Sequence, residues 1–435
     1  MSITAQPSPN LLSIPNEILA EICTYATDGD GSEGLRRNGK SWLKAVRLTC
    51  KQLYDPSTIV FGKRHLSHLS IMVARGSLEE LLKICGHRLI GPQVQKISLF
   101  GCRLDRKLLQ PLREDLDYWI RRNDLQSIRH ARLRLQLFLD FLEEEMEFGD
   151  KKGIFQLLVN ALSKLWSYGR SMSLAVFTDL DDRLRPILGR REAVEQISEN
   201  NRLTLRDKIN CDAVRCSLNT LCSAAIESSC RVHQLSLEVY ESWYEAASSQ
   251  RERSNGVTSY EKKVLLDVKD LYLVADSFTD NLDGLVKTVF LHTKNLETLY
   301  LWPMLFPDVE VYWAHVNSFG RTIRSLQSDR LHKIEFEEAV CRQKDLISLL
   351  ARHRKTLREL HLTNFGLVGS WEDVMIWIRD HCSLTCLSVS GLEEYDKDGY
   401  QISSTVPNNF PNDLSRLDEF LEQRRAKQAE LEEED

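Results

Sequence analysis

The 435-residue sequence lacks the features of several protein classes. Its first ten residues, MSITAQPSPN, have neither the basic start nor the apolar core of a signal peptide. No apolar run reaches the roughly 20 residues that a membrane-spanning helix needs. The net charge is only −6, which gives no reason to expect nucleic acid as a partner. We therefore expect a protein of the cytoplasm, the nucleus or both, with no membrane or nucleic acid among its partners.

The motifs of common enzyme and metal sites are also missing. The chain has no P-loop and no Gly-x-Ser-x-Gly elbow. Its eleven cysteines are scattered, and none forms a Cys-x-x-Cys pair. The densest group runs from Cys211 to His233 in spacings that match no zinc pattern, and a helix that leads into a strand at Gln234 explains it better. We therefore expect a non-catalytic protein with no metal and no cofactor; a hydrolase or thiol enzyme is the weakest alternative.

The stretch 11–61 predicts two short helices. Pro15 suits the first position of a helix, and Glu17 can reach back toward the free N–H groups. Apolar residues repeat at helical spacing in two sets: Ile18, Ile22 and Tyr25, then Leu43, Val46, Cys50 and Leu53. We expect Pro56 to end the second helix. Two helices of this size cannot bury both apolar faces alone, so the hairpin needs a partner.

This hairpin resembles the F-box, most closely the fungal type. The resemblance rests on the opening Ile-Pro-Asn-Glu-Ile-Leu at 14–19 and on the later run Arg-Leu-Thr-Cys-Lys at 47–51. Ile14 replaces the usual Leu, and the spacer 27–41 is longer than is usual in the family. The resemblance implies docking on a Skp-type adaptor, which carries the receptor to cullin and RING subunits. The residues implied in adaptor binding are Ile14, Pro15, Ile18, Leu19, Ile22, Leu48, Cys50 and Leu53. The alternative is an amphipathic hairpin that only opens a globular domain.

Short alternating runs recur through the rest of the chain and predict strands. They lie at 94–99, 171–176, 234–237, 270–273, 298–301, 333–336, 359–362 and 386–389. From Leu237 to Val389 they follow one another every 26 to 36 residues, with amphipathic helices between them. A strand plus a helix at this period resembles the leucine-rich repeat, although the Asn or Cys expected after each strand is mostly missing. An ordinary parallel α/β sheet is the alternative. We favour the solenoid because the period is short and no phosphate-binding glycine loop follows any strand.

Together these patterns predict an α/β (α+β) fold: an N-terminal helical F-box, then a leucine-rich-repeat-like solenoid of parallel strands and helices. We expect a flexible lead at 1–10, the F-box-like module at 11–66, the solenoid at 67–422 and a charged tail at 423–435. A helical insertion is expected at 103–169. Within it, residues 133–141 also alternate like a strand, but their length and straight side chains favour a helix.

In such a solenoid, the residues between the inward leucines face the concave surface. This predicts one strip made of Glu238, Tyr272, Tyr300, Trp302, Glu335, Glu337, His361 and Ser388. The candidate substrate contacts are Tyr272, Tyr300, Trp302, Glu335 and His361, because aromatic side chains are favoured interface anchors. The alternative is a partly covered aromatic patch without a ligand.

The sequence therefore predicts the substrate-recognition subunit of an SCF-type (Skp–cullin–F-box) E3 ubiquitin ligase, which promotes degradation of an unknown protein substrate. The F-box would hold the adaptor and the repeat surface would hold the substrate. The alternative is a non-catalytic leucine-rich-repeat scaffold with no connection to a ligase.

Overall fold

The computed structural model describes residues 14–28, 43, 45–49, 51–72, 74–100, 109–147, 151–177, 187–188, 211–239, 263–275, 280–303, 309–397, 400–403, 422 and 426. The predicted lead at 1–10, most of the spacer, Cys50 and all of the tail except Ala426 lie outside these residues. Within them, no helix combines the length and the apolarity needed to cross a bilayer.

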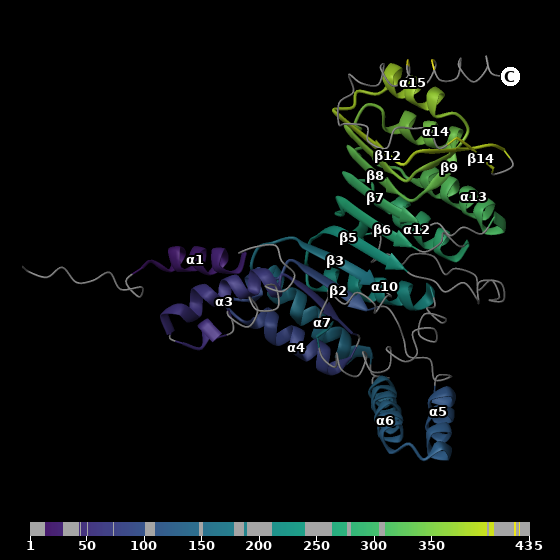
Figure 1. Cartoon of the computed structure of the whole chain (residues 1–435). Helices are drawn as coiled ribbons and strands as arrows, with labels where there is room; N and C mark the ends of the chain where they lie inside the picture. Colours follow the sequence, from purple (N-terminus) through teal and green to yellow (C-terminus); the bar gives the residue numbers. More distant parts are fainter. Residues whose placement is uncertain are drawn as a thin grey trace, which may run out of the picture.

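The fold is α/β, built around a ten-stranded parallel sheet (Figure 1). In sheet order its strands are β12 (Cys386–Ser390), β10 (Glu359–Thr363), β8 (Lys333–Glu337), β7 (Thr298–Pro303), β6 (Asp270–Ala275), β5 (Val232–Val239), β3 (Met172–Phe177), β2 (Lys96–Phe100), β1 (His68–Ile71) and β4 (Ile187–Leu188). The eight predicted strands are all present. Except for the two-residue β4, each strand lies beside the next strand of this sheet along the chain.

One row of helices runs along the sheet. Its members are α4 (Arg75–Gly86), α7 (Lys151–Trp166), α10 (Cys211–Glu227), α12 (Asp280–His292), α13 (Val309–Ser325), α14 (Gln343–His353) and α15 (Trp371–His381). Each of these helices contacts the next one in the row. Figure 1 shows the later members stacked along the same side of the strands. The helices therefore cover one face of the sheet.

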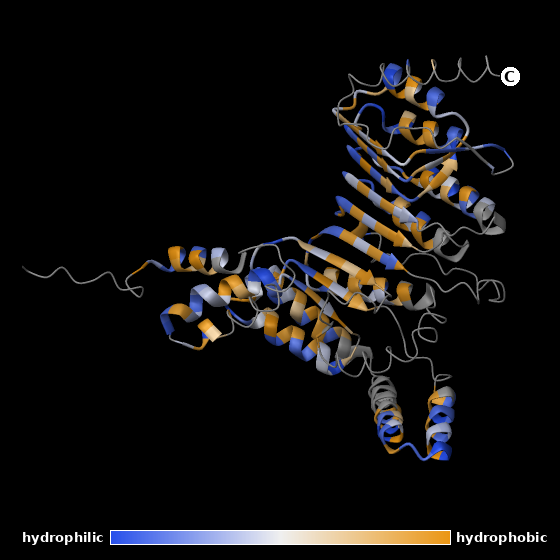
Figure 2. Ribbon diagram, in the orientation of Figure 1, coloured by the Kyte–Doolittle hydropathy of each residue, from blue (hydrophilic) through white to orange (hydrophobic). Residues whose placement is uncertain are grey.

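Alternation decides which side chains face the helices. In β6, β7, β8, β10 and β12 every second residue is buried, and Figure 2 shows the alternation as hydrophobic and hydrophilic bands. A further buried leucine lies two residues before four of these strands, at Leu296, Leu331, Leu357 and Leu384. In β2 and β3 almost every residue is buried, because small side chains such as Ser98 and Ala175 occupy the second face.

A second, four-stranded sheet forms at the C-terminal end. It consists of β9 (Val340–Arg342), β11 (Gly366–Val368), β13 (Glu393–Tyr395) and β14 (Gln401–Ser403). The first three strands follow β8, β10 and β12, and in each case the residue directly after the longer strand has a positive φ: Glu338, Asn364 and Gly391, at 49°, 49° and 60°. The same left-handed turn therefore recurs three times and turns the chain into the second sheet.

The expected helical insertion is narrower in the structure. The helices α5 (Leu109–Arg122) and α6 (Leu125–Glu147) contact each other and project from the body (Figure 1). The competing strand interpretation of 133–141 is wrong, because these residues are helical. Residues 151–166 form α7, which contacts α4 and α10 and so belongs to the helix row.

The N-terminal hairpin consists of α1 (Asn16–Asp28) and α3 (Lys51–His65), with helical backbone also at Leu43 and at 45–47. The expectation that Pro56 ends the second helix is wrong. A turn at 48–49 separates the two helical pieces, and α3 then continues through the proline. Pro56 removes one backbone hydrogen bond, but Pro56, Ser57 and Thr58 are buried, and this tertiary packing holds the segment helical.

Candidate functional site

The inner side of the hairpin is packed. Cys23, Leu43, Val60 and Phe61 form a small core of their own, separate from the main core beneath the sheet. Leu19 lies one turn before Cys23 and is only 1% exposed. Burial also raises the pKa of the Cys23 thiol. The two helices thus bury one face of α1 between them.

The outer side of α1 is uncovered. Ile18, Ile22 and Tyr25 are 45%, 42% and 70% exposed, and their spacing places them on one face of the helix. Leu48, in the turn before α3, is 86% exposed. In Figure 1, α1 lies at the end of the molecule away from the successive strand and helix units of residues 270–390, which we call the C-terminal repeats. Figure 2 shows hydrophobic residues along α1. We call Ile18, Ile22 and Tyr25 the outer stripe.

The predicted adaptor-binding residues divide between these two sides. Ile18, Ile22, Leu48 and Pro15 are exposed, and Ile14 and Leu53 are half-buried. Leu19 is a correction: its side chain lies inside the hairpin, because it sits about 100° around the helix from Ile18. Cys50 lies outside the described residues. Tyr25 was not predicted as a site residue, although its spacing from Ile18 and Ile22 was the signal that identifies it.

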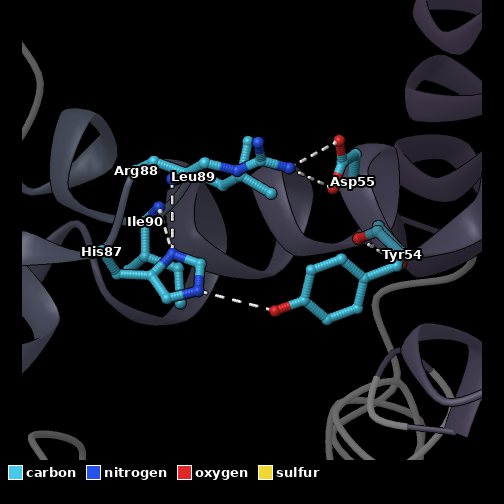
Figure 3. Close-up of polar contacts among 7 residues, drawn as sticks. Tyr54, Asp55, His87, Arg88, Leu89 and Ile90 are labelled. Atoms are coloured by element: carbon cyan, nitrogen blue, oxygen red, sulfur yellow. Dashed lines mark hydrogen bonds and ion pairs between the residues drawn. The ribbon is translucent and has the colours of Figure 1, made fainter. Parts of the chain in front are cut away.

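Polar contacts join α3 to the body (Figure 3). The Tyr54 hydroxyl lies 3.5 Å from His87 Nε2, and Arg88 Nη2 lies 3.3 Å from Asp55 Oδ2. His87 Nδ1 accepts hydrogen bonds from the backbone N–H groups of Leu89 and Ile90, both at 3.3 Å. The neutral ring therefore carries its proton on Nε2, the nitrogen that faces Tyr54.

Close packing reinforces this junction. Gly62 of α3 approaches the 3₁₀ turn η2 (Gly91–Gln93) so closely that a Cβ added to it would lie 3.2 Å from Gln93 Cγ. The ion pair between Arg88 and Asp55 is largely exposed and contributes little stability. It is α3 that fastens the hairpin to the body, and the outer stripe of α1 takes no part in the junction.

The second candidate surface lies on the open face of the sheet. The strand register places Tyr272, Tyr300, Glu335 and His361 side by side on neighbouring strands. The rings of Tyr272 and Tyr300 are 5.7 Å apart, centroid to centroid. Ser388 continues this row beyond His361. Trp302 and Glu337 lie two residues further along their strands, and Glu238 lies in line with Trp302.

Hydrogen bonds hold two of the aromatic side chains of this surface, Tyr300 and Trp302. The Tyr300 hydroxyl donates to Glu337 Oε2 at 2.6 Å, and Trp302 Nε1 donates to Glu338 Oε2 at 2.9 Å. Burial, followed by the hydrogen bond to Glu337, raises the pKa of Tyr300 well above its ordinary value. These hydrogen bonds order the rings of Tyr300 and Trp302. Side chains that are already ordered lose less conformational entropy when they contact a ligand.

Charged groups flank the rings. Lys333 Nζ lies 3.4 Å from Glu335 and 3.9 Å from Glu359, and His361 Nε2 lies 3.5 Å from Glu359. These side chains are 24–41% exposed, so the pairs contribute little to stability. Two carboxylates, Glu335 and Glu359, lie beside the single lysine Lys333, so the surface next to the aromatic rings is acidic.

The cysteine group that the sequence singled out lies where a helix leads into a strand, in α10 and β5, as expected. Burial raises the pKa of the Cys230 thiol to about 12. It therefore stays protonated near neutral pH, which makes it a poor nucleophile.

No protein-family model matches this chain, and no curated protein sequence matches it.

Proposed function

We propose that this protein is the substrate-recognition subunit of an SCF-type (Skp–cullin–F-box) E3 ubiquitin ligase. The observation that carries the proposal is the outer stripe, which stays uncovered although the hairpin already has a core and a junction with the body. Exposed apolar side chains gathered on one helix face are typical of protein interaction sites. The F-box-like sequence names the class of partner, a Skp-type adaptor, and through it the cullin and RING subunits.

In this role the protein performs no chemistry itself. It holds a protein substrate beside the ubiquitin-charged enzyme that the RING subunit recruits, and so raises the effective concentration of the two reactants. This work takes place in the cytoplasm, the nucleus or both. Tyr272, Tyr300, Trp302, Glu335 and His361 are the proposed contacts with the substrate.

The sheet is proposed to be a degenerate leucine-rich-repeat solenoid. Two observations support this: the strands follow chain order in a single direction, and the helices form a single row. An open doubly wound sheet would instead reverse its strand order at a switch point. A solenoid presents its uncovered strand face as an extended binding surface. Tyr272, Tyr300 and Trp302, which we call the aromatic row, lie on that face.

Adaptor binding by variants of the outer stripe tests the proposal. Ile18→Glu/Ile22→Glu should weaken binding to a purified Skp-type adaptor by about a hundredfold, because each buried isoleucine contributes on the order of 1.5 kcal/mol. The matched control is Leu125→Glu/Leu133→Glu, which changes two exposed leucines on α6 and should bind like the parent. Circular dichroism checks that both variants fold. Equal adaptor binding by both variants, or none by the parent, would contradict the proposal.

A scaffold without a ligase, whose hairpin merely caps the solenoid, is the alternative. A chain that lacks residues 1–49 separates the two, because it keeps α3 and its junction but loses α1. A docking module should leave the melting temperature of the sheet unchanged, whereas loss of a cap should lower it and cause aggregation. Removal of residues 1–66 is the positive control and should destabilise the protein in either case, since it exposes the surface beneath α3.

A further inference from the structure

A cleft of about 730 Å³ lies at the C-terminal end of the molecule, away from both surfaces above. Trp313 of α13 and Ile347 of α14 line one part of it, and Val368 of β11 lines another. Arg342 at the end of β9, Lys344 in the first turn of α14 and Lys397 beyond β13 also line it, together with the polar residues Gln343 and Ser348. The cleft therefore combines three cations with an indole ring and two aliphatic side chains.

The three cations have no partners within the part of the chain that the structure describes. Neither Arg342, Lys344 nor Lys397 forms an ion pair or a side-chain hydrogen bond there. Of the nearby carboxylates, Asp345 lies 3.6 Å from Arg324, and Asp373 accepts a hydrogen bond from Gln343, which itself lines the cleft. No carboxylate is among the described residues that line the cleft. Positive charge therefore predominates among the described side chains that line the cleft, which favours an anionic ligand.

The number of cations indicates the kind of anion. A carboxylate offers two oxygens and one negative charge, which a single arginine can satisfy. A phosphate monoester carries nearly two charges and three acceptor oxygens, so it can engage all three cations. The volume lies within the range of small-molecule sites and exceeds what a bare phosphate fills, while Trp313, Ile347 and Val368 offer an apolar wall for the rest of the ligand.

We propose that this cleft binds a phosphate monoester whose organic part contains an aromatic ring. Arg342, Lys344 and Lys397 hold the phosphate, and Trp313 with its aliphatic neighbours contacts the ring. Two sources supply this chemistry: a phosphotyrosine side chain of another protein, or a soluble phosphate monoester that also bears an aromatic ring, such as a nucleoside monophosphate, whose phosphate is on the ribose and whose base is the ring. The inference does not depend on the ligase proposal, since it uses no residue of the hairpin or of the aromatic row.

Calorimetric titration of the full chain with phenyl phosphate tests the phosphate site. Lys344→Glu/Lys397→Glu should raise the Kd for phenyl phosphate by about a hundredfold, roughly tenfold for each lost charge-assisted contact. Both lysines are exposed, so the variant should keep the parent's circular dichroism and melting temperature. Lys164→Glu/Lys355→Glu is the matched control with the same change of net charge, and it should bind like the parent. The proposal is overturned if the parent shows no binding or if both variants lose affinity equally.

A second comparison tests the ring and identifies the source. The parent should prefer phenyl phosphate over inorganic phosphate, and Trp313→Ala should abolish that preference; a preference that survives would overturn the proposal. Titrations with a tyrosine-phosphorylated peptide and with adenosine 5′-monophosphate then compare the two sources. Tighter binding of the peptide supports a protein ligand, and tighter binding of the nucleotide supports a soluble one. If neither binds better than inorganic phosphate, the proposal fails.

Discussion

The N-terminal hairpin and the C-terminal repeats bury their apolar side chains to very different degrees. In the repeats, Phe319, Phe336, Phe365 and Trp371 are at most 1% exposed, and their neighbouring rings lie 5.5–6.3 Å apart. Among the described residues, the hairpin buries a small core around Cys23, Leu43, Val60 and Phe61, with Leu19 beside it, and leaves the outer stripe of α1 uncovered. The aromatic side chains of the repeats are buried by other parts of the same chain, whereas the outer stripe of the hairpin is exposed to solvent.

This difference follows from the architecture. Every helix in the middle of the row has a sheet beneath it and a helix on either side, so its apolar face is always met. In the hairpin, by contrast, α1 packs against α3, and α3 packs against η2 and the end of α4. We therefore expect the repeats to dominate global stability, and we expect α1 to open locally at a lower free energy.

The largest expected effect lies in the aromatic core of the repeats. Phe336 is fully buried and stacks on Phe365 at 5.8 Å. Phe336→Ala should lower the free energy of unfolding by about 3–5 kcal/mol, because it leaves a cavity. Tyr25→Ala, at a 70% exposed position of the hairpin, should change it by less than about 0.5 kcal/mol. Urea unfolding measures both, and similar values would remove the contrast between the two regions.

A pH dependence should also arise in the repeats. Burial, followed by repulsion from Arg352, lowers the pKa of His353 to about 4. In the unfolded chain this pKa is about 6.5, so the unfolded state takes up a proton first as the pH falls. The free energy of unfolding is therefore unaffected by His353 above about pH 6.5, and it falls by about 3 kcal/mol as the pH is lowered toward 4.

The variant His353→Gln isolates this effect. The difference in unfolding free energy between parent and variant should change over that pH interval and stay constant above it. Unfolding curves at several pH values measure it. A difference that is independent of pH would show that His353 does not stay neutral in the folded protein.

Neighbouring positions of α1 should separate the two sides of the hairpin. Leu19→Ala removes a buried side chain and should cost about 2–3 kcal/mol, whereas Ile18→Ala on the outer stripe should cost less than about 0.5 kcal/mol. Because α1 opens locally, amide hydrogen exchange in α1 measures this better than global unfolding. Equal exchange in both variants would mean that α1 does not pack through Leu19.

The smallest expected effect concerns the open face of the sheet. Tyr300→Phe removes the hydroxyl that donates to Glu337 and should lower the free energy of unfolding by about 1 kcal/mol. Tyr272→Phe is the matched control, since its hydroxyl makes no hydrogen bond with a described residue. Thermal unfolding compares the two. An equal effect of both changes would indicate that the bond to Glu337 contributes nothing.

The sequence predicted eight of the ten strands of the sheet, all except β1 and β4, because alternation has a local cause. Any strand covered by helices on one face needs an apolar residue at every second position, and Leu360 and Leu362 of β10 satisfy this directly. The turns into the second sheet were missed. Glu338, Asn364 and Gly391 all adopt a left-handed backbone; Asn and Gly favour it, but Glu does not, so residue type alone does not reveal the recurring turn.

The candidate site was predictable in the same measure. Helical spacing placed Ile18 and Ile22 on one face of a helix, and strand alternation placed the aromatic residues on one face of the sheet. The division of α1 into an inner side at Leu19 and an outer stripe was decided by where α3 packs, and the cationic cleft by how α13, α14 and the second sheet meet. The periodicity of apolar residues can be read from the sequence because each helix or strand needs an apolar face. Which face finds a neighbour, and which charges from distant segments share a cleft, depends on contacts that form only when the elements pack together.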